Sequence, residues 1–316
     1  MSSDRILITG VSGFVGGRLA DCIIDSGVYG VTGVSRTAFS KSYPVFEIPS
    51  FFDLPAVDAL FDGVSVVVHA AARVHVMSDT ESDPLQAFRE VNVEGALNFA
   101  RQAAAAGVKR FIFISSIKVN GEQTRLGQPF FSHDDPSPED FYGISKHEAE
   151  QGLRELAVET GMEVVIIRPP LVYGPGVKGN FASMIKLVGK GLPLPLGAVH
   201  NKRSLVALDN LVDLIITCID HPGAVNETFL ISDGGDLSTT QLLQGVAAAM
   251  GKPSRLIPVP AGLLQFGATL LGKKAVAQRL LGSLQVDISH TRKCLNWIPP
   301  LTVKQGLQRC FPNQQD

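Results

Sequence analysis

The chain is poor in charge, in cysteine and in long apolar runs, and each shortage excludes a class of protein. Only 18% of its 316 residues are Asp, Glu, Lys or Arg, and the formal net charge is −2 at pH 7. This balance gives no overall basic field that would attract nucleic acid or an anionic membrane, so an anionic ligand must be held locally. No apolar run reaches the ~18 residues typical of a membrane-spanning helix, and no membrane span is expected.

The few cysteines are scattered, at Cys22, Cys218, Cys294 and Cys310. They form no C-x-x-C pair and have no histidine at metal-ligand spacing, which favours reduced thiols and predicts no metal site. The first residues lack the basic start, apolar stretch and cleavage site of a signal peptide, so we expect a cytoplasmic protein. With 45% hydrophobic residues, 31 Gly and 19 Pro, the composition is that of a folded chain with one large domain or two coupled ones.

Short apolar runs alternate with helical patterns along the first half of the chain. The runs typical of buried strands are Ile6 to Thr9, Val31 to Val34, Val64 to His69, Phe111 to Ser115 and Val164 to Arg168. Helical patterns separate them, one of them starting at Asp83-Pro84 and ending at Gly107. This alternation predicts an α/β fold with a doubly wound parallel sheet of the Rossmann type.

Proline and glycine become frequent after Arg168 and interrupt regular structure until about Arg203. We interpret this stretch as the substrate side of the molecule. The predicted dinucleotide-binding domain therefore comprises residues 1–168 and about 204–232. A smaller, discontinuous α/β domain comprises about 169–203 and 233–316.

A glycine-rich loop joins the first strand to the first helix. It contains Gly10, Gly13, Phe14, Val15 and Gly16. Glycines allow a pyrophosphate to approach the backbone, and the start of the following helix supplies free N–H groups. A glycine triplet between a strand and a helix therefore predicts a dinucleotide site.

The residues after the next strands determine which dinucleotide fits. An NAD enzyme usually has an acidic residue about 20 residues past the glycines, where this chain has Ser35 and Arg36. Because a guanidinium can pair with a 2′-phosphate, we predict NADP(H) rather than NAD(H). Further residues at the carboxyl ends of strands are expected to line the cofactor: Asp53, Leu54, Ala70, Ala71 and Ala72. We interpret His69, which precedes these alanines, as a satisfied buried histidine.

Tyr142 and Lys146 begin the next long helix and are four residues apart, so they share one helix face. A tyrosine has a pKa of about 10 and is a poor base at neutral pH. A neighbouring ammonium lowers that pKa, and the pair predicts a tyrosine that exchanges protons.

Together these motifs resemble the extended short-chain dehydrogenase/reductase family, which contains nucleotide-sugar epimerases, dehydratases and ketoreductases. The resemblance rests on the glycine loop, Asn92, Ser116, Tyr142-x-x-x-Lys146 and the run from Arg168 to Pro175. It implies that Tyr142 exchanges a proton with a sugar hydroxyl or ketone, that Ser116 binds the same oxygen, and that Lys146 binds the nicotinamide ribose. It also implies cofactor contacts at Asn92 and Pro169, and a homodimer formed by the helices of residues 84–106 and 142–160.

The resemblance extends to the substrate. Asn180 and Arg203 resemble the family's contacts to a sugar nucleotide, Arg279 is a candidate second ligand of the diphosphate, and His75 a candidate for the sugar pocket. These residues imply a UDP-sugar. The family's dehydratases have an Asp-Glu pair directly after the Ser or Thr, where this chain has Ile117 and Lys118, so dehydration is not expected.

The sequence is compatible with two reactions at C4 of the sugar. Arg36 favours a 4-ketoreductase that uses NADPH. The run from Ala71 to Met77 also resembles the bacterial surface-polysaccharide (lipopolysaccharide) branch, which reduces a UDP-2-acetamido-2,6-dideoxy-4-keto-hexose. The alternative is a 4-epimerase of a UDP-hexose or UDP-HexNAc that retains NAD. A third hypothesis is that the protein is not an enzyme but a regulator that binds a dinucleotide. Such proteins typically lack the tyrosine or the lysine that this chain has at Tyr142 and Lys146.

Overall fold

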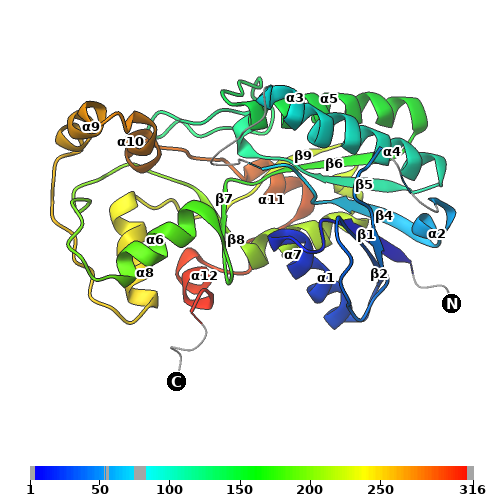
Figure 1. Cartoon of the computed structure of the whole chain (residues 1–316), viewed down its shortest axis with the longest axis horizontal. Coiled ribbons are helices and arrows are strands. Elements are labelled where there is room, and N and C mark those ends of the chain that lie inside the picture. Colours follow the sequence, from blue (N-terminus) through cyan, green and yellow to red (C-terminus); the bar gives the residue numbers. More distant parts are fainter. Residues whose placement is uncertain (1–3, 53, 55–56, 75–82, 312–316) are drawn as a thin grey trace.

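A parallel sheet is the centre of the structure, a computed structural model that describes residues 4–52, 54, 57–74 and 83–311 (Figure 1). Within these residues seven strands pair in the order β3-β2-β1-β4-β5-β6-β9, and every pair is parallel. Their bounds are β1 (Arg5–Thr9), β2 (Gly30–Ser35), β3 (Val45–Glu47), β4 (Val64–His69), β5 (Arg110–Ile114), β6 (Glu163–Arg168) and β9 (Thr228–Leu230). The doubly wound α/β fold is confirmed, and the carboxyl ends of the strands meet at one edge.

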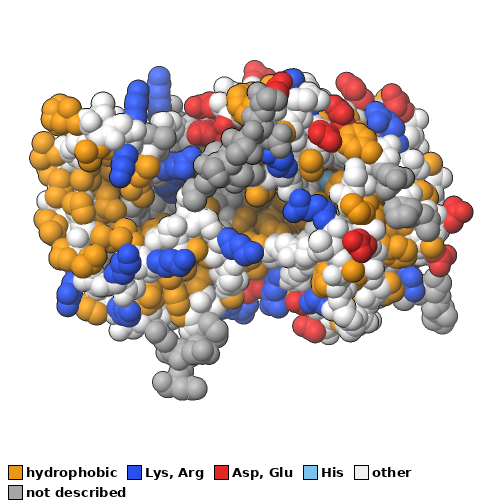
Figure 2. Space-filling view, viewed as in Figure 1, with side chains coloured by type: hydrophobic (Ala, Val, Ile, Leu, Met, Phe, Trp, Pro, Cys, Tyr) orange, Lys and Arg blue, Asp and Glu red, His pale blue; other side chains and the backbone are white. Residues whose placement is uncertain are grey.

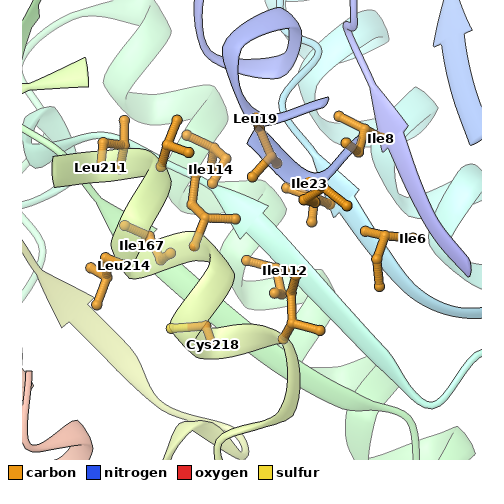
Figure 3. Close-up of a cluster of buried hydrophobic side chains, with 14 of the residues drawn as sticks. Ile6, Ile8, Leu19, Ile23, Ile112, Ile114, Ile167, Leu211, Leu214 and Cys218 are labelled. Atoms are coloured by element: carbon orange, nitrogen blue, oxygen red, sulfur yellow. The ribbon is translucent and has the colours of Figure 1, made fainter. Parts of the chain in front are cut away.

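Helices cover both faces of the sheet because successive side chains of each strand point to opposite sides. Ile6 and Ile8 of β1 pack toward α1 (Phe14–Ser26) and α7 (Leu208–Asp220), as Figure 3 shows. Leu7, between them, packs into the opposite cluster. That cluster is formed by the sheet with α2 (Val57–Phe61), α4 (Ala96–Ala105) and α5 (Phe141–Thr160).

The helix boundaries follow the local signals in the sequence. The Asp83 side chain accepts a hydrogen bond from the backbone N–H of Gln86 at the start of α3 (Pro84–Arg89). A π-helical turn, Glu90–Gly95, links α3 to α4. Asp140 caps α5 in the same way as Asp83 caps α3, and Gly161 ends α5 with a φ of 76°. Glycine is suited to this left-handed position because it has no Cβ.

A second lobe lies beside the sheet (Figure 1). It contains β7 (Leu171–Tyr173), β8 (Leu205–Ala207), α6 (Gly179–Gly189), α8 (Thr239–Ala249), α9 (Ala261–Leu270), α10 (Lys274–Leu281) and α12 (Val303–Arg309). The helix α11 (Ser289–Leu295) follows α10 but packs back against β9. Trp297, just after α11, is buried in the cluster of α1 and α7, where its indole N–H donates to Asp213. None of the described helices is long and apolar enough to cross a membrane.

Candidate active site

The glycine loop lies at the carboxyl edge of the sheet, directly against the chain that follows β4. A Cβ on Gly10 would lie 2.9 Å from the backbone nitrogen of Ala71, and one on Gly16 would lie 2.5 Å from the carbonyl oxygen of Gly10. Gly10 also has a φ of 73°. Only glycine satisfies both the space and the backbone angle at Gly10, so the loop has the tight path that was expected of it.

The start of α1 is free to donate hydrogen bonds to an anion. Its N-cap, Gly13, has no side chain to cap the first N–H groups, and no acidic residue occupies the first turn. The half-buried side chains of Phe14 and Val15 pack on the cluster of α1 and α7. An uncapped helix start beside a glycine loop fits the pyrophosphate of a dinucleotide.

The structure brings further predicted cofactor residues to this edge. Ser35 is buried at the end of β2, where its hydroxyl donates to Ser12, and Arg36 lies exposed directly after it. The half-buried alanines Ala70, Ala71 and Ala72 follow β4. Leu54 packs on the cluster beneath α4 and α5. Asp53 and His75 lie outside the described residues.

Ser116 stands between the ends of β5 and β6. It precedes a 3-10 turn, Ile117–Val119, and its hydroxyl accepts a hydrogen bond from the N–H of Lys118. The N–H of Ile117 donates to the carbonyl oxygen of the buried Pro169, which holds this turn against the end of β6. The half-buried Ser116 is thereby fixed beside the chain that leaves the sheet.

Asp140 fixes the start of α5 against the same turn. One carboxylate oxygen accepts a hydrogen bond of 2.7 Å from the N–H of Gly143, and the other pairs with the ammonium of Lys118. Lys118 also bonds Glu122 at 2.8 Å. Ile117 and Lys118 occupy the positions that hold the acidic pair in the dehydratases. In this protein Ile117 is buried, and Lys118 forms ion pairs that hold the turn against α5.

Tyr142 lies in the first turn of α5, with its ring edge-on to Phe88 at 6.2 Å. The expectation that Lys146 lowers its pKa is wrong for this structure. Burial raises the pKa of Tyr142 above its usual range, and the negative charge of Asp140 raises it further. The tyrosine is therefore a neutral proton donor near pH 7.

The side chain of Lys146 is held within the core. Its side chain is 1% exposed, its Nζ donates to the carbonyl oxygen of Ile114 at 2.8 Å, and it lies 4.1 Å from the centre of the Phe113 ring. Because burial disfavours the ammonium, the pKa of Lys146 falls to about 7. Lys146, which is expected from the sequence to carry a positive charge, is therefore only partly protonated near pH 7.

This position of Lys146 predicts a pH-dependent stability. Between a folded-state pKa of about 7 and the ordinary value of 10.5, the unfolded chain binds more protons at this group, so the free energy of unfolding rises with pH. Urea unfolding at pH 7, 8 and 9 should show the wild type gaining stability relative to Lys146→Met as pH rises. An equal slope for the two proteins would contradict the buried, partly neutral lysine.

His69 is satisfied within the core, which confirms its interpretation. Its Nδ1 lies 3.1 Å from the hydroxyl of Thr9, and its ring stacks on those of Phe111 and Phe113. Burial lowers the pKa of His69 to about 3, so the ring is neutral. Since Thr9 accepts from the N–H of Ala71, its own hydroxyl proton is available to His69. The histidine supports the loop after β4.

The side chain of Asn92, which the resemblance places at the cofactor, is instead bonded within the protein. Its Oδ1 accepts from the N–H of Arg73 at 2.8 Å, and its Nδ2 donates to the carbonyl oxygen of Arg73 and to the hydroxyl of Ser145. Asn92 is buried in the π-helical turn before α4. It therefore positions the cofactor-side loop against α5, because its donors and acceptor are all used.

A buried ionic network that sequence reasoning missed lies behind Ser116 and Lys146. Glu150 pairs with Arg168 through two hydrogen bonds, of 2.9 and 2.6 Å, and also accepts from the hydroxyl of Ser115. Arg168 donates in turn to Asn120, whose amide binds the carbonyl oxygen of Phe131. The exposed fractions of Glu150 and Arg168 are 0% and 2%. Asn120, in place of the family's tyrosine, thus links the network to the loop of residues 121–137.

A signal for this network was present in the sequence. Glu150 follows Lys146 by four residues and Tyr142 by eight, so it shares their helix face. A carboxylate on a face that turns toward the core needs a buried cation as partner. That partner, Arg168, comes from the end of β6, and only the fold brings the two together.

Arg203 is a candidate substrate-binding residue whose positive charge is not paired in an ion pair among the described residues. It is half-buried, and its Nη1 donates to the carbonyl oxygen of Gly282 at 3.1 Å. Burial lowers its pKa. The Glu122 carboxylate partly offsets this lowering, but it forms no ion pair with Arg203. A half-buried guanidinium that forms no ion pair among the described residues fits an anionic ligand.

The other two candidate substrate residues, Arg279 and Asn180, lie on two different helices. Arg279 is exposed in the last turn of α10, three residues before the Gly282 carbonyl that Arg203 binds. Asn180 is exposed in the first turn of α6, and its side chain makes none of the hydrogen bonds recorded among the described residues. An open cavity of about 510 Å³ adjoins this region, lined by residues 198–201, 260–261 and 281. The structure thus brings Arg203 and the end of α10 together, and leaves Asn180 on another helix.

A parallel sheet, a glycine loop against an uncapped helix and a Ser-Tyr-Lys set at one edge define a dinucleotide-dependent α/β enzyme. The profile described as "NAD dependent epimerase/dehydratase family" matches residues 6–232. The chain belongs to this family, which confirms the resemblance to extended short-chain dehydrogenases. A nicotinamide dinucleotide is the cofactor that this family uses, and the residues described above fit it.

Three similar proteins cover nearly the whole chain. A UDP-glucose 4-epimerase of Vibrio cholerae is 51% identical over 96% of this chain and 93% of its own length. An N-acetyl-α-D-glucosaminyl-diphospho-ditrans,octacis-undecaprenol 4-epimerase of Escherichia coli O157:H7 is 30% identical over 97% of this chain and 94% of its own. The crystal structure of a Thermotoga maritima UDP-glucose 4-epimerase with UDP-glucose has a TM-score of 0.76 at 24% identity, covering 97% of each chain, and shows the shared fold.

Proposed function

We propose that this protein is a UDP-sugar 4-epimerase that uses a nicotinamide dinucleotide, with a UDP-hexose as substrate. The observation that carries the proposal is the 51% identity to the Vibrio cholerae UDP-glucose 4-epimerase along 96% of the chain. The site supports it, because Ser116 and the Tyr142-Lys146 pair stand at the same sheet edge as the glycine loop. We retain UDP as the carrier because the half-buried Arg203, which forms no ion pair among the described residues, fits a diphosphate.

Each group of residues has a role in this proposal. The backbone at Gly10, Gly13, Phe14, Val15 and Gly16 holds the pyrophosphate, and the residues after β2 and β4 hold the adenosine side. A nicotinamide dinucleotide bound there would supply the hydride chemistry at C4, with removal and return of one hydride and no net consumption of cofactor. Tyr142 would act as a phenolate that takes the proton of the C4 hydroxyl when the hydride leaves C4 and gives it back when the hydride returns, while Ser116 binds that oxygen. This step requires the ammonium of Lys146 and the bound dinucleotide to lower the pKa of Tyr142, which burial raises in the structure. Lys146, whose Nζ donates to Ile114 in the structure, would instead bind the nicotinamide ribose, where a polar partner would offset the cost of its burial.

The second candidate is an NADPH-dependent 4-ketoreductase, and one observation favours it. Arg36 is exposed at the end of β2, where an NAD enzyme usually has an acidic residue. A guanidinium there can hold the 2′-phosphate of NADP. The two candidates share Ser116, Tyr142 and Lys146, and differ in whether the hydride returns to the same sugar.

Two parallel assays distinguish these candidates. The first incubates the protein with UDP-glucose or UDP-GlcNAc and a catalytic amount of NAD, and follows the C4 epimer by chromatography. The second supplies NADPH and UDP-2-acetamido-2,6-dideoxy-4-keto-hexose and follows the reduced-nicotinamide absorbance. Epimer formation without net cofactor consumption is the expected result. Stoichiometric NADPH consumption with no epimer would replace the proposal by the ketoreductase, and inactivity in both assays would overturn both.

Arg203→Met should weaken substrate binding without changing the chemical step. A charge-assisted hydrogen bond to phosphate contributes about 1.5–3 kcal/mol, so KM for the UDP-sugar should rise about 10- to 100-fold while kcat changes little. Arg292→Met, which alters an exposed arginine on α11, is the matched control and should behave as the wild type. An unchanged KM in Arg203→Met would remove Arg203 from the diphosphate site.

We also propose a homodimer that pairs α3, α4 and α5 with their copies. These helices lie together on one face of the sheet, and the apolar side chains of Phe141 and Val158 on α5 are exposed there. Analytical ultracentrifugation should give twice the mass of 33.7 kDa. A monomer at all concentrations would reject it.

A further inference from the structure

The helix α9 presents an apolar face to solvent. It has ten residues, none of them buried, and none of them charged. Leu263, Phe266 and Leu270 are 64%, 64% and 72% exposed, and their spacing of three and four places them on one side of the helix. Leu271, 73% exposed, extends the same surface. On the other side of the helix, Leu264 packs against the buried cluster of Leu194, Leu196, Val199 and Leu243.

The lobe that carries α9 is strongly basic, although the whole chain is close to neutral. Residues 174–208 and 237–286 contain ten Lys or Arg and no Asp or Glu, while the rest of the chain has 30 Asp or Glu against 18 Lys or Arg. Eight of the ten are exposed: Lys178, Lys186, Lys190, Lys252, Arg255, Lys273, Lys274 and Arg279. The near-zero net charge therefore hides a separation of charge between the two ends of the molecule.

The fold joins these two basic segments into one surface. Lys252 and Arg255 donate to the carbonyl oxygens of Gly189 and Gly191 at the end of α6, and backbone bridges pair Leu194 with Leu256. Figure 2 shows Lys and Arg around the apolar area at the α9 end, with the acidic groups of this view toward the middle and the opposite end. Lys273 and Lys274 follow the end of α9 after Leu271 and Gly272.

We propose that the α9 face, defined as Leu263, Phe266, Leu270 and Leu271, docks the protein on an anionic lipid bilayer. An exposed apolar helix flanked by cations matches the two parts of a membrane surface, because its side chains enter the interface while Lys273 and Lys274 lie at the headgroups. Ten residues are about 15 Å of helix, too short to span the hydrocarbon core, so the helix lies in the plane of the surface.

The charge of the lobe selects this occupant over a second copy of the chain. A symmetric dimer through α9 would bring two equally basic surfaces together, and like charges across an interface oppose association. Anionic headgroups offer the opposite sign over an extended plane. The inference is independent of the proposed reaction, since the α9 face contains none of the residues assigned to cofactor or substrate.

Vesicle sedimentation tests the proposal with the full chain. The probes are vesicles of phosphatidylcholine alone and vesicles with 40% phosphatidylglycerol, each at low and high salt. We expect the protein to sediment with the anionic vesicles at low salt, and to be released by high salt or by omission of phosphatidylglycerol. The triple variant Leu263→Ser, Phe266→Ser, Leu270→Ser should reduce the partition by about tenfold or more.

Matched variants separate docking from folding. Val28→Ser together with Ile298→Ser removes exposed apolar side chains elsewhere and should sediment as the wild type. The triple variant should retain its thermal midpoint and its turnover of a soluble UDP-sugar. Sedimentation that is absent, or equal in the triple variant, would overturn the proposal. A concentration-dependent dimer that the triple variant abolishes, without vesicle binding, would assign the α9 face to a second copy instead.

Discussion

Tyr142→Phe is expected to lose about a thousandfold in turnover while it keeps its fold. General acid–base catalysis by a positioned side chain contributes about 10²–10⁴-fold, and Tyr142 is the only proposed proton-transfer group of the site. The ring packs edge-on against Phe88, and a phenylalanine preserves that contact. The loss should therefore appear in kcat, with KM for the UDP-sugar little changed. Steady-state epimerisation at saturating dinucleotide measures it.

A matched control separates the chemistry from the loss of a hydroxyl. Tyr29 donates its hydroxyl to Asp220 on an exposed part of the sheet lobe, away from the glycine loop. Tyr29→Phe should retain the activity of the wild type. Both variants should bind the dinucleotide with unchanged affinity in a fluorescence titration. Near-full turnover by Tyr142→Phe would require another proton-transfer group and would reject the assignment.

The buried pair of Glu150 and Arg168 gives the second large prediction. Glu150→Leu or Arg168→Met should each lower the free energy of unfolding by about 3–5 kcal/mol, because each leaves an uncompensated charge in the core. The exposed fractions of 0% and 2% leave neither group access to water. Chemical denaturation monitored by circular dichroism measures the loss.

A double-mutant cycle tests whether charge pairing is the cause. The variant Glu150→Leu, Arg168→Met removes both charges and should recover part of the stability that either single change loses. Arg154→Met removes an exposed ion-pair partner of the same Glu150 and should cost less than about 1 kcal/mol. Additive losses in the double variant would mean that packing, rather than the buried pair, stabilises this region.

The network of Glu150 and Arg168 should also affect the reaction, because it helps to hold Ser116 in place. Ser115 donates to Glu150, and the next residue, Ser116, is the group that binds the substrate oxygen. The double variant retains an apolar core but leaves Ser115 without its acceptor. We expect a reduced kcat in the double variant even where stability recovers, because Ser116 is then less firmly positioned.

The linear sequence by itself determined the fold class and the location of the chemistry. Strand runs that alternate with capped helices require a parallel sheet, and glycines at Gly10 and Gly16 are needed wherever a backbone approaches within 3 Å. The four-residue spacing of Tyr142 and Lys146 guarantees a shared helix face once α5 forms. These features are local, so they are readable without knowledge of the neighbours in space.

Only the tertiary structure decided the electrostatics and the roles that depend on distant partners. The pKa of Tyr142 rises because of burial, and Lys146 binds Ile114 instead of the tyrosine. Asn92 supports a loop 19 residues away, and Glu150 meets Arg168 only because α5 packs on β6. Burial and charge pairing arise from groups far apart in the chain. Spacing along the sequence therefore identifies which residues can act, and packing determines the charge that each of them carries.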